Sequence, residues 1–161
     1  MKVLLTGANG YVGSYLIGAL MSAGFSVTTL TRKSHLREGT VNFVVDEYCP
    51  AGISPCLVGQ DVVIHLAGLA HQISKNKDAA EALYMRVNVE QTLMLAREAK
   101  NAGIKRFIFM SSIKVNGEST AEGAPFRADM IPAPEDAYGR SKWAAEQALS
   151  ALFEGSHTEL V

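Results

Sequence analysis

A tyrosine and a lysine four residues apart, Tyr138 and Lys142, form the pattern in this sequence that best suits acid–base chemistry. In a helix this spacing puts both side chains on one face, within reach of a common ligand. A lysine ammonium about 4 Å from a phenol oxygen favours the phenolate by roughly 4 kcal/mol at an effective dielectric constant of about 20. The pair therefore predicts a general acid–base centre at Tyr138. The alternative is an aromatic residue that packs on the core at the start of a helix.

Two serines, Ser111 and Ser112, follow a short apolar segment at residues 106–110. If this segment is a strand of a parallel sheet, its carboxyl end lies at the edge where such sheets bind ligands. A hydroxyl there could hydrogen-bond the same substrate oxygen as Tyr138. Serine pairs after strands also serve ordinary turns. The prediction of a site therefore depends on the combination of these serines with Tyr138 and Lys142.

A glycine-rich turn with the sequence TGANGYVG, residues 6–13, separates a strand-like segment from a helical pattern. This is the context of a dinucleotide-binding turn. Gly7 permits the tight turn, Gly10 lets the backbone approach a pyrophosphate, and Gly13 lets the helix pack close to the strand. We therefore predict a nicotinamide dinucleotide as cofactor. The alternative is a turn without a ligand.

Other residues are candidates to bind the remainder of the dinucleotide. The N–H groups at the helix start, at Tyr11 and Val12, would hold the phosphates. The second strand ends in Thr31 and Arg32, followed by lysine and serine and by no carboxylate. These cations and hydroxyls suit a 2′-phosphate and favour NADP over NAD, unless they belong to a solvated loop. Asp46 could accept a hydrogen bond from the adenine amino group or could be a turn residue.

Alternating apolar segments and helical patterns position these residues. We predict strands at residues 3–5, 26–30, 41–45, 61–66 and 106–110, and helices at residues 12–23, 78–102 and 138–152. Such an alternation is typical of an α/β fold whose parallel sheet is covered on both faces. No prediction is made for residues 31–40. Residues 117–136 contain three prolines and two glycines without periodicity, and we interpret them as a substrate-facing loop or a mobile surface segment.

The amino-acid composition limits the classes of protein to which this chain can belong. The 161 residues are 48% hydrophobic and 19% charged, which fits one folded domain. The net charge of -1 gives no basic footprint for nucleic acid, and no apolar run is long enough to cross a membrane or to form a signal peptide. Cys49 and Cys56 are expected to be free thiols in the cytoplasm. The four histidines, which show no metal-ligand spacing, are His35, His65, His71 and His157. Of these, His65 is expected to be a hydrogen-bonded core residue.

Taken together, the motifs resemble the extended short-chain dehydrogenase/reductase family, the NAD-dependent epimerase/dehydratases that act on nucleotide sugars. Five segments occur in the family's order over nearly the whole chain: TGANGYVG, DVVIHLAG (Asp61–Gly68), RVNVEQTL with Asn88, FIFMSSIKVNGE (Phe107–Glu118) and YGRSK (Tyr138–Lys142). The resemblance implies a Rossmann-type doubly wound parallel sheet. It also implies a UDP-sugar substrate and hydride transfer between a nicotinamide cofactor and C4 of the hexose.

The resemblance also implies roles for individual residues. Ser112 would be the catalytic serine, Tyr138 the base, and Lys142 its partner, which also binds the nicotinamide ribose. Ser111 would line the cofactor together with the backbone of a short segment, namely Leu66, Ala67 and Gly68. Asn88 would support the site from its helix, although it could also be an ordinary polar helix residue.

Two departures narrow the subclass. Sugar 4,6-dehydratases of this family carry an acidic pair directly after the catalytic serine or threonine, and here Ile113 and Lys114 stand there. Asn116 replaces a tyrosine that is common in the family. The segment most closely resembles UDP-hexose 4-epimerases and UDP-N-acetylquinovosamine-type 4-reductases of surface polysaccharide synthesis, and the sequence leaves both reactions open.

The length of the chain limits how much of the family's fold it can contain. Members of the family are usually about twice as long, so we expect this chain to end before the sixth strand and the C-terminal substrate domain. It would then be either a fragment of a longer enzyme or a truncated module that binds NAD(P) without turnover. Helices 78–102 and 138–152 resemble the pair that forms the family's dimer, which predicts a homodimer.

Overall fold

A computed structural model describes residues 1–34, 37–70, 77–120 and 122–161. Within these ranges the strands form one six-stranded sheet in the order β3-β2-β1-β4-β5-β6, and every neighbouring pair is parallel. The strands are β1 (Lys2–Thr6), β2 (Ser26–Thr31), β3 (Val41–Val44), β4 (Val62–His65), β5 (Arg106–Phe109) and β6 (Glu159–Leu160). The helices are α1 (Tyr11–Ser22), α2 (Pro50–Leu57), α3 (Lys77–Tyr84), η1 (Met85–Glu90), α4 (Gln91–Asn101), η2 (Ile113–Val115) and α5 (Ala137–Phe153). The predicted α/β fold is confirmed.

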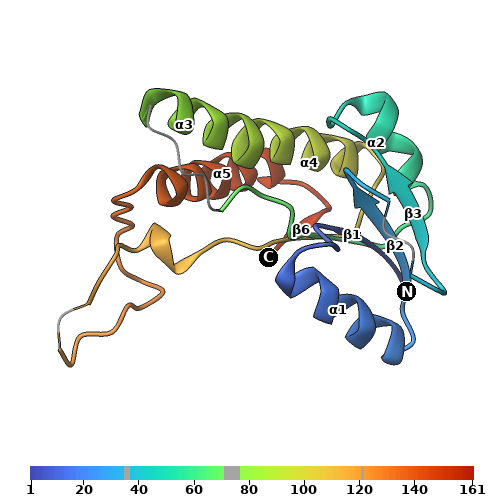
Figure 1. Ribbon diagram of the computed structural model, residues 1–161, viewed down its shortest axis with the longest axis horizontal. Coiled ribbons are helices and arrows are strands. Elements are labelled where there is room, and N and C mark those ends of the chain that lie inside the picture. The colour runs from blue at the N-terminus through green and yellow to red at the C-terminus, as the bar shows by residue number, and fades with distance from the viewer. Residues whose placement is uncertain (35–36, 71–76, 121) are drawn as a thin grey trace.

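Two hydrophobic layers hold the sheet between the helices (Figure 1). Side chains alternate along a strand, so β1 buries Leu4 on one face and Val3 and Leu5 on the other. Leu4 belongs to the core cluster that includes residues of α2, α4 and α5. Val3 and Leu5 belong to the cluster beneath α1, around Ile17. Because all strands are parallel, their carboxyl ends meet at one edge, where the predicted site residues gather.

The helical layer differs from the prediction in two places. The helix expected at residues 78–102 is helical from Lys77 to Asn101, but its centre, Met85–Glu90, is a π-helical turn between α3 and α4. The short helix α2 was not predicted, because it has only eight residues and carries Gly52 and Pro55 in its interior. Proline and glycine are the least favourable residues inside helices, so this segment carries no helical pattern.

The end of the chain corrects another expectation. Glu159 and Leu160 pair with Arg106 and Phe107 of β5, so a short sixth strand is already present. The prediction that the chain ends before the sixth strand is therefore wrong, because two residues of this strand are present and pair with β5. Along the described part of residues 31–40, turns and bends follow β2, and no helix forms there.

The proline-rich segment 117–136 contains neither helix nor strand among its described residues. Figure 1 shows it leaving the body of the molecule between η2 and α5. It is attached at its base, where the Ala133 N–H donates to the Val115 carbonyl at 3.0 Å. The described residues include no helix that is long and apolar enough to cross a membrane.

Candidate active site

The glycine turn packs directly against the end of β4. Gly7 has a positive φ of 71°, and a Cβ added to it would lie 2.7 Å from the Ala67 amide nitrogen. A Cβ on Gly13 would lie 2.2 Å from the Gly7 carbonyl oxygen, so α1 approaches β1 as closely as the sequence predicts. Gly10 is the N-cap of α1 and offers no capping side chain, so the first N–H groups of the helix remain available to an anion. The N–H of Gly10 itself donates to the Gly7 carbonyl at 2.9 Å. This backbone cradle fits a pyrophosphate.

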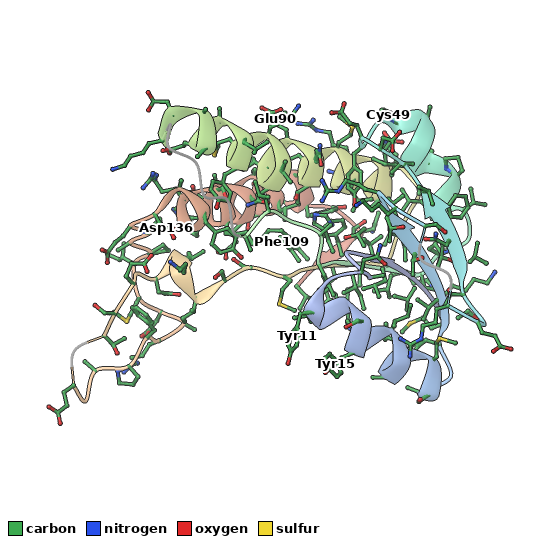
Figure 2. The ribbon with its side chains drawn as sticks, viewed as in Figure 1. Tyr11, Tyr15, Cys49, Glu90, Phe109 and Asp136 are labelled. Atoms are coloured by element: carbon green, nitrogen blue, oxygen red, sulfur yellow. The ribbon has the colours of Figure 1, made fainter. Side chains whose placement is uncertain are left out.

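The next two N–H groups belong to Tyr11 and Val12, the first residues of α1. Both side chains are exposed, and Figure 2 shows Tyr11 together with Tyr15 on the outer side of α1. The Tyr11 and Tyr15 rings contact each other at a centroid distance of 5.3 Å. Their side chains therefore leave the backbone of the turn open to a ligand.

Two neighbouring pockets extend from this cradle along the sheet edge. One of about 330 Å³ is lined by Gly7, Asn9, Gly10, Leu30, Thr31, Arg32, Tyr48, Leu66, Ala67 and Gly68. The other, of about 300 Å³, shares four of these residues and adds, among others, Asp46, Glu47 and Arg86. The pockets therefore bring together eight of the cofactor residues predicted from the sequence. They also place Arg32 in the same pocket as the carboxylates of Asp46 and Glu47.

Tyr48 lines both pockets, although no motif in the sequence marks it as a site residue. Burial raises the pKa of its hydroxyl to about 12, although a hydrogen bond to Thr6 acts in the opposite direction. Tyr48 therefore stays neutral, and its phenol forms part of the lining of both pockets.

Beneath the pockets, His65 is part of a buried polar network. Its Nδ1 lies 2.7 Å from Thr6 Oγ1, and its Nε2 lies 2.9 Å from Thr92 Oγ1. Burial, and then the charge of Lys142, lowers the pKa of the imidazole to about 3. The expectation of a hydrogen-bonded core histidine is confirmed. Thr6 Oγ1 also accepts the Ala67 N–H, so the network supports the backbone beside the glycine turn.

Asn88 projects from the π-helical turn and is almost completely buried. Its Oδ1 accepts the Leu69 N–H at 2.7 Å, and its Nδ2 donates to the Leu69 carbonyl and to Ser141 Oγ, each at 2.9 Å. π-Helical turns are frequent at functional sites because they redirect side chains. Asn88 thus joins the segment after β4 to α5 at the residue before Lys142.

Lys142 lies at the sheet edge with only 5% of its surface exposed. Its Nζ is 4.2 Å from the centre of the Phe109 ring, and a Cβ added to Gly68 would lie 3.8 Å from it. Figure 2 shows Phe109 in the middle of the molecule. Burial lowers the pKa of Lys142 to about 8, while the charge of Glu146 acts in the opposite direction. The lysine can therefore gain or lose its proton near neutral pH.

Tyr138 lies one helical turn before Lys142, in the first turn of α5. Asp136 caps this turn by accepting the Gly139 N–H at 2.6 Å. The Tyr138 ring is half-buried, 6.0 Å from the Tyr84 ring, and borders a pocket of about 570 Å³ between α3 and α5. That the Tyr138 hydroxyl meets the Lys142 amine remains a prediction.

The turn after β5 is fixed to the start of α5. Ser112 caps η2 by accepting the Lys114 N–H at 3.3 Å. The Lys114 ammonium donates to Asp136 at 2.7 Å and to Glu118 at 2.8 Å, and Asp136 first and then Glu118 raise its pKa. A Cβ on Gly139 would lie 2.6 Å from the Lys114 carbonyl oxygen, so the two segments touch. Lys114 therefore connects the elements that carry Ser112 and Tyr138.

Ser111 reveals another residue that the sequence analysis missed. Its hydroxyl donates to the carboxylate of Glu146, one turn beyond Lys142 on α5. The i,i+4 spacing of Lys142 and Glu146 was the available signal, but the bond to Ser111 depends on how β5 and α5 pack.

The described residues contain no cluster of three His, Cys, Asp or Glu that could hold a metal ion. Cys49 and Cys56 are both free, and His35 and His71 lie outside the described residues.

Comparison with known proteins gives one family. The family model described as "NAD dependent epimerase/dehydratase family" matches residues 3–159. A UDP-glucose 4-epimerase from Vibrio cholerae is 39% identical over 162 residues, which cover 99% of this chain and 49% of the relative. The chain therefore spans about half the length of the curated relatives that it matches.

Two solved structures resemble the fold closely. A short-chain dehydrogenase/reductase superfamily protein from Agrobacterium tumefaciens with bound NAD gives a TM-score of 0.87 at 27% identity, covering 100% of this chain and 48% of that one. The protein MoeE5 in complex with UDP-glucose and NAD gives 0.82 at 28% identity, covering 99% and 52%. Both of these proteins are described with bound NAD.

Proposed function

Because this chain belongs to the NAD-dependent epimerase/dehydratase family, we propose that it forms the cofactor-binding and catalytic part of a nucleotide-sugar enzyme. The proposed reaction takes place at C4 of a UDP-hexose, as a 4-epimerisation or a 4-keto reduction. The observation that carries the proposal is the position of Lys142. Its buried ammonium lies beside Gly68 at the end of β4 and one helical turn from Tyr138.

Each proposed catalytic residue has a separate task. A bound nicotinamide would accept or supply the hydride. Tyr138 would take the proton of the sugar O4 hydroxyl or return it, and the Lys142 ammonium would favour the phenolate that takes it. Ser112 would hydrogen-bond the same oxygen. Asn88 would hold the backbone of Leu69 in place beside Lys142.

The residues that would hold the dinucleotide are those of the cradle and its pockets. The N–H groups at Tyr11 and Val12 would face the pyrophosphate, whereas the Gly10 N–H donates to the Gly7 carbonyl and closes the turn. The preference for NADP remains a prediction from Arg32 and its neighbouring lysine. Two facts stand against this preference for NADP. The carboxylates of Asp46 and Glu47 line the same pocket as Arg32 and would repel a 2′-phosphate, and both solved structures named above contain NAD.

We also propose a homodimer through the surface of α3, α4 and α5, which lie side by side in Figure 1. Arg140 of α5 donates to both oxygens of Glu81 on α3, at 2.9 and 2.8 Å, and so fixes these helices together. Light scattering tests the proposal, and a monomer at micromolar concentration would contradict it. A cytoplasmic location and a role in polysaccharide synthesis stay predictions.

The decisive experiment separates catalysis from binding alone. The chain is mixed with NAD⁺ and UDP-glucose, and in parallel with NADPH and a UDP-4-keto-hexose. Formation of UDP-galactose supports the epimerase, and loss of the NADPH absorbance band supports the reductase. The control is Tyr138→Phe, which keeps the ring and removes the proton carrier. Dinucleotide binding without either reaction identifies the chain as a binding module, and absence of binding contradicts the whole proposal.

A further inference from the structure

Glu146 occupies a position between two predicted site residues. It lies on α5 one turn after Lys142, so the two side chains share a face of the helix. It also accepts the hydroxyl hydrogen of Ser111, the residue that follows β5 by two positions and precedes Ser112. Its side chain is half-buried, at the contact between β5 and α5. One carboxylate therefore bonds the residue that precedes Ser112 from a position on the same helix face as Lys142.

The surroundings of Lys142 make this carboxylate important. A buried ammonium loses the hydration that stabilises its charge, and burial accordingly lowers the pKa of Lys142 to about 8. Among the residues that the structure describes, the Phe109 ring of β5 and the imidazole of His65 on β4, which is neutral, act on it from other elements. Glu146 is the carboxylate whose charge acts on Lys142 and raises its pKa.

We propose that Glu146 is a positioning residue: its carboxylate, through Ser111, fixes the end of β5 against α5 and places a negative charge on the helix face of the buried Lys142 ammonium. This proposal rests on the proposed function only for the use of the ammonium, which would favour the phenolate of Tyr138. The positioning itself is a property of the chain without any ligand. It is therefore testable without turnover.

A simple structural bond between Ser111 and Glu146 makes a different prediction. Glutamine at position 146 keeps an oxygen that can accept the Ser111 hydroxyl but removes the negative charge. If the carboxylate supports the ammonium, Glu146→Gln lowers the pKa of Lys142 by about one unit. At pH 7.5 the lysine would then change from mostly charged to mostly neutral. If the bond is only structural, the pKa of Lys142 stays where it is.

The experiment measures the pKa of Lys142 by NMR in chains labelled with ¹³C at the lysine ε-carbon, with Lys142→Arg to assign the signal. Ser111→Ala removes the bond to β5 but leaves the carboxylate, so the pKa of Lys142 should remain at the wild-type value. Glu154→Gln, which changes an exposed acid directly after the last residue of α5, is the matched charge control. A fall of the pKa in Glu146→Gln alone supports the proposal, and an unchanged pKa in that variant overturns it.

A second readout concerns the ligand. The dissociation constant of NAD⁺ is measured against pH in the wild type and in Glu146→Gln. We expect the loss of affinity that accompanies Lys142 deprotonation to begin about one pH unit lower in the variant. If the wild type binds no dinucleotide, the proposed function fails, while the NMR titration still decides the role of Glu146. The two failures are thus distinguishable.

Discussion

The ammonium of Lys142 lies 4.2 Å from the centre of the Phe109 ring, inside the protein and at the carboxyl edge of the sheet. The face of an aromatic ring attracts a cation, and the attraction grows when water is excluded. It offsets only part of the hydration that the buried ammonium loses, because the pKa of Lys142 still falls to about 8. The protein therefore holds a charge whose burial costs stability, as is common for groups that act in catalysis.

The first prediction concerns this cost. Below pH 8 the amine of Lys142 is charged in both the folded and the unfolded chain, and its charge disfavours folding. Between pH 8 and about 10.5 the folded chain releases the proton while the unfolded chain keeps it, so stability rises. Lys142→Met should remove this rise and increase the free energy of unfolding at pH 7 by up to about 3 kcal/mol. Urea unfolding at several pH values measures it, with exposed Lys33→Met as the control that leaves the slope unchanged.

The second prediction concerns His65, whose pKa is lowered to about 3 by burial. Below pH 6.5 the unfolded chain takes up a proton that the folded chain refuses, so stability falls as the pH falls toward 3. Between pH 6.5 and 5 this histidine should account for a loss of about 2 kcal/mol. His65→Gln should flatten that part of the profile, whereas exposed His157→Gln should not. Equal slopes in the wild type and His65→Gln would contradict the assignment.

The third prediction tests the glycine cradle. Gly13→Ala places a Cβ against the Gly7 carbonyl oxygen, which is backbone and has little freedom to move. The turn must open, and the dissociation constant of the dinucleotide should rise by about tenfold or more, which corresponds to about 1.4 kcal/mol. Gly18→Ala on the same helix meets only the end of the flexible Arg37 side chain, and it should bind normally. Calorimetric titration compares the two variants.

The fourth prediction concerns the choice of cofactor. If Arg32 binds a 2′-phosphate, the wild type should bind NADP⁺ more tightly than NAD⁺, and Arg32→Ala should remove the difference. If Asp46 and Glu47 dominate the pocket, NAD⁺ should bind more tightly, and Glu47→Gln should narrow the gap because it removes one repelling charge. Dissociation constants at a fixed ionic strength distinguish the two, since charge contacts weaken with salt.

The sequence predicted the parts of the fold that depend on local pattern. The strands β1 and β4 were clearest, because buried parallel strands are continuous apolar runs, as in residues 62–65. β2 and β3 carry threonine or asparagine between their apolar residues, and the β-branched residues and aromatic ring there still favour strands. The π-helical turn at Asn88 was invisible, since a π turn and an α turn have nearly the same apolar pattern. The two-residue strand β6 gave no signal of its own.

The site was predictable in its residues but not in its connections. Tyr138, Lys142 and Ser112 could be selected from spacing and from resemblance. The contacts of Ser111 with Glu146 and of Lys114 with Asp136 join residues 35 and 22 positions apart. Such pairs depend on the packing of β5 and the turn after it against α5, which no local pattern specifies.

The last prediction uses the contact between Lys114 and Asp136. These side chains are partly exposed, and exposed ion pairs contribute little to stability. Lys114→Met should therefore leave the free energy of unfolding and the affinity for dinucleotide nearly unchanged. It should nevertheless lower turnover about tenfold, because a small displacement of Ser112 from Tyr138 is costly to catalysis. Lys105→Met breaks an ion pair with Asp61 at the amino ends of β4 and β5, far from the carboxyl edge that carries the site. This variant should leave turnover intact. Turnover that is equal in the two variants would show that the site does not depend on the Lys114 contact.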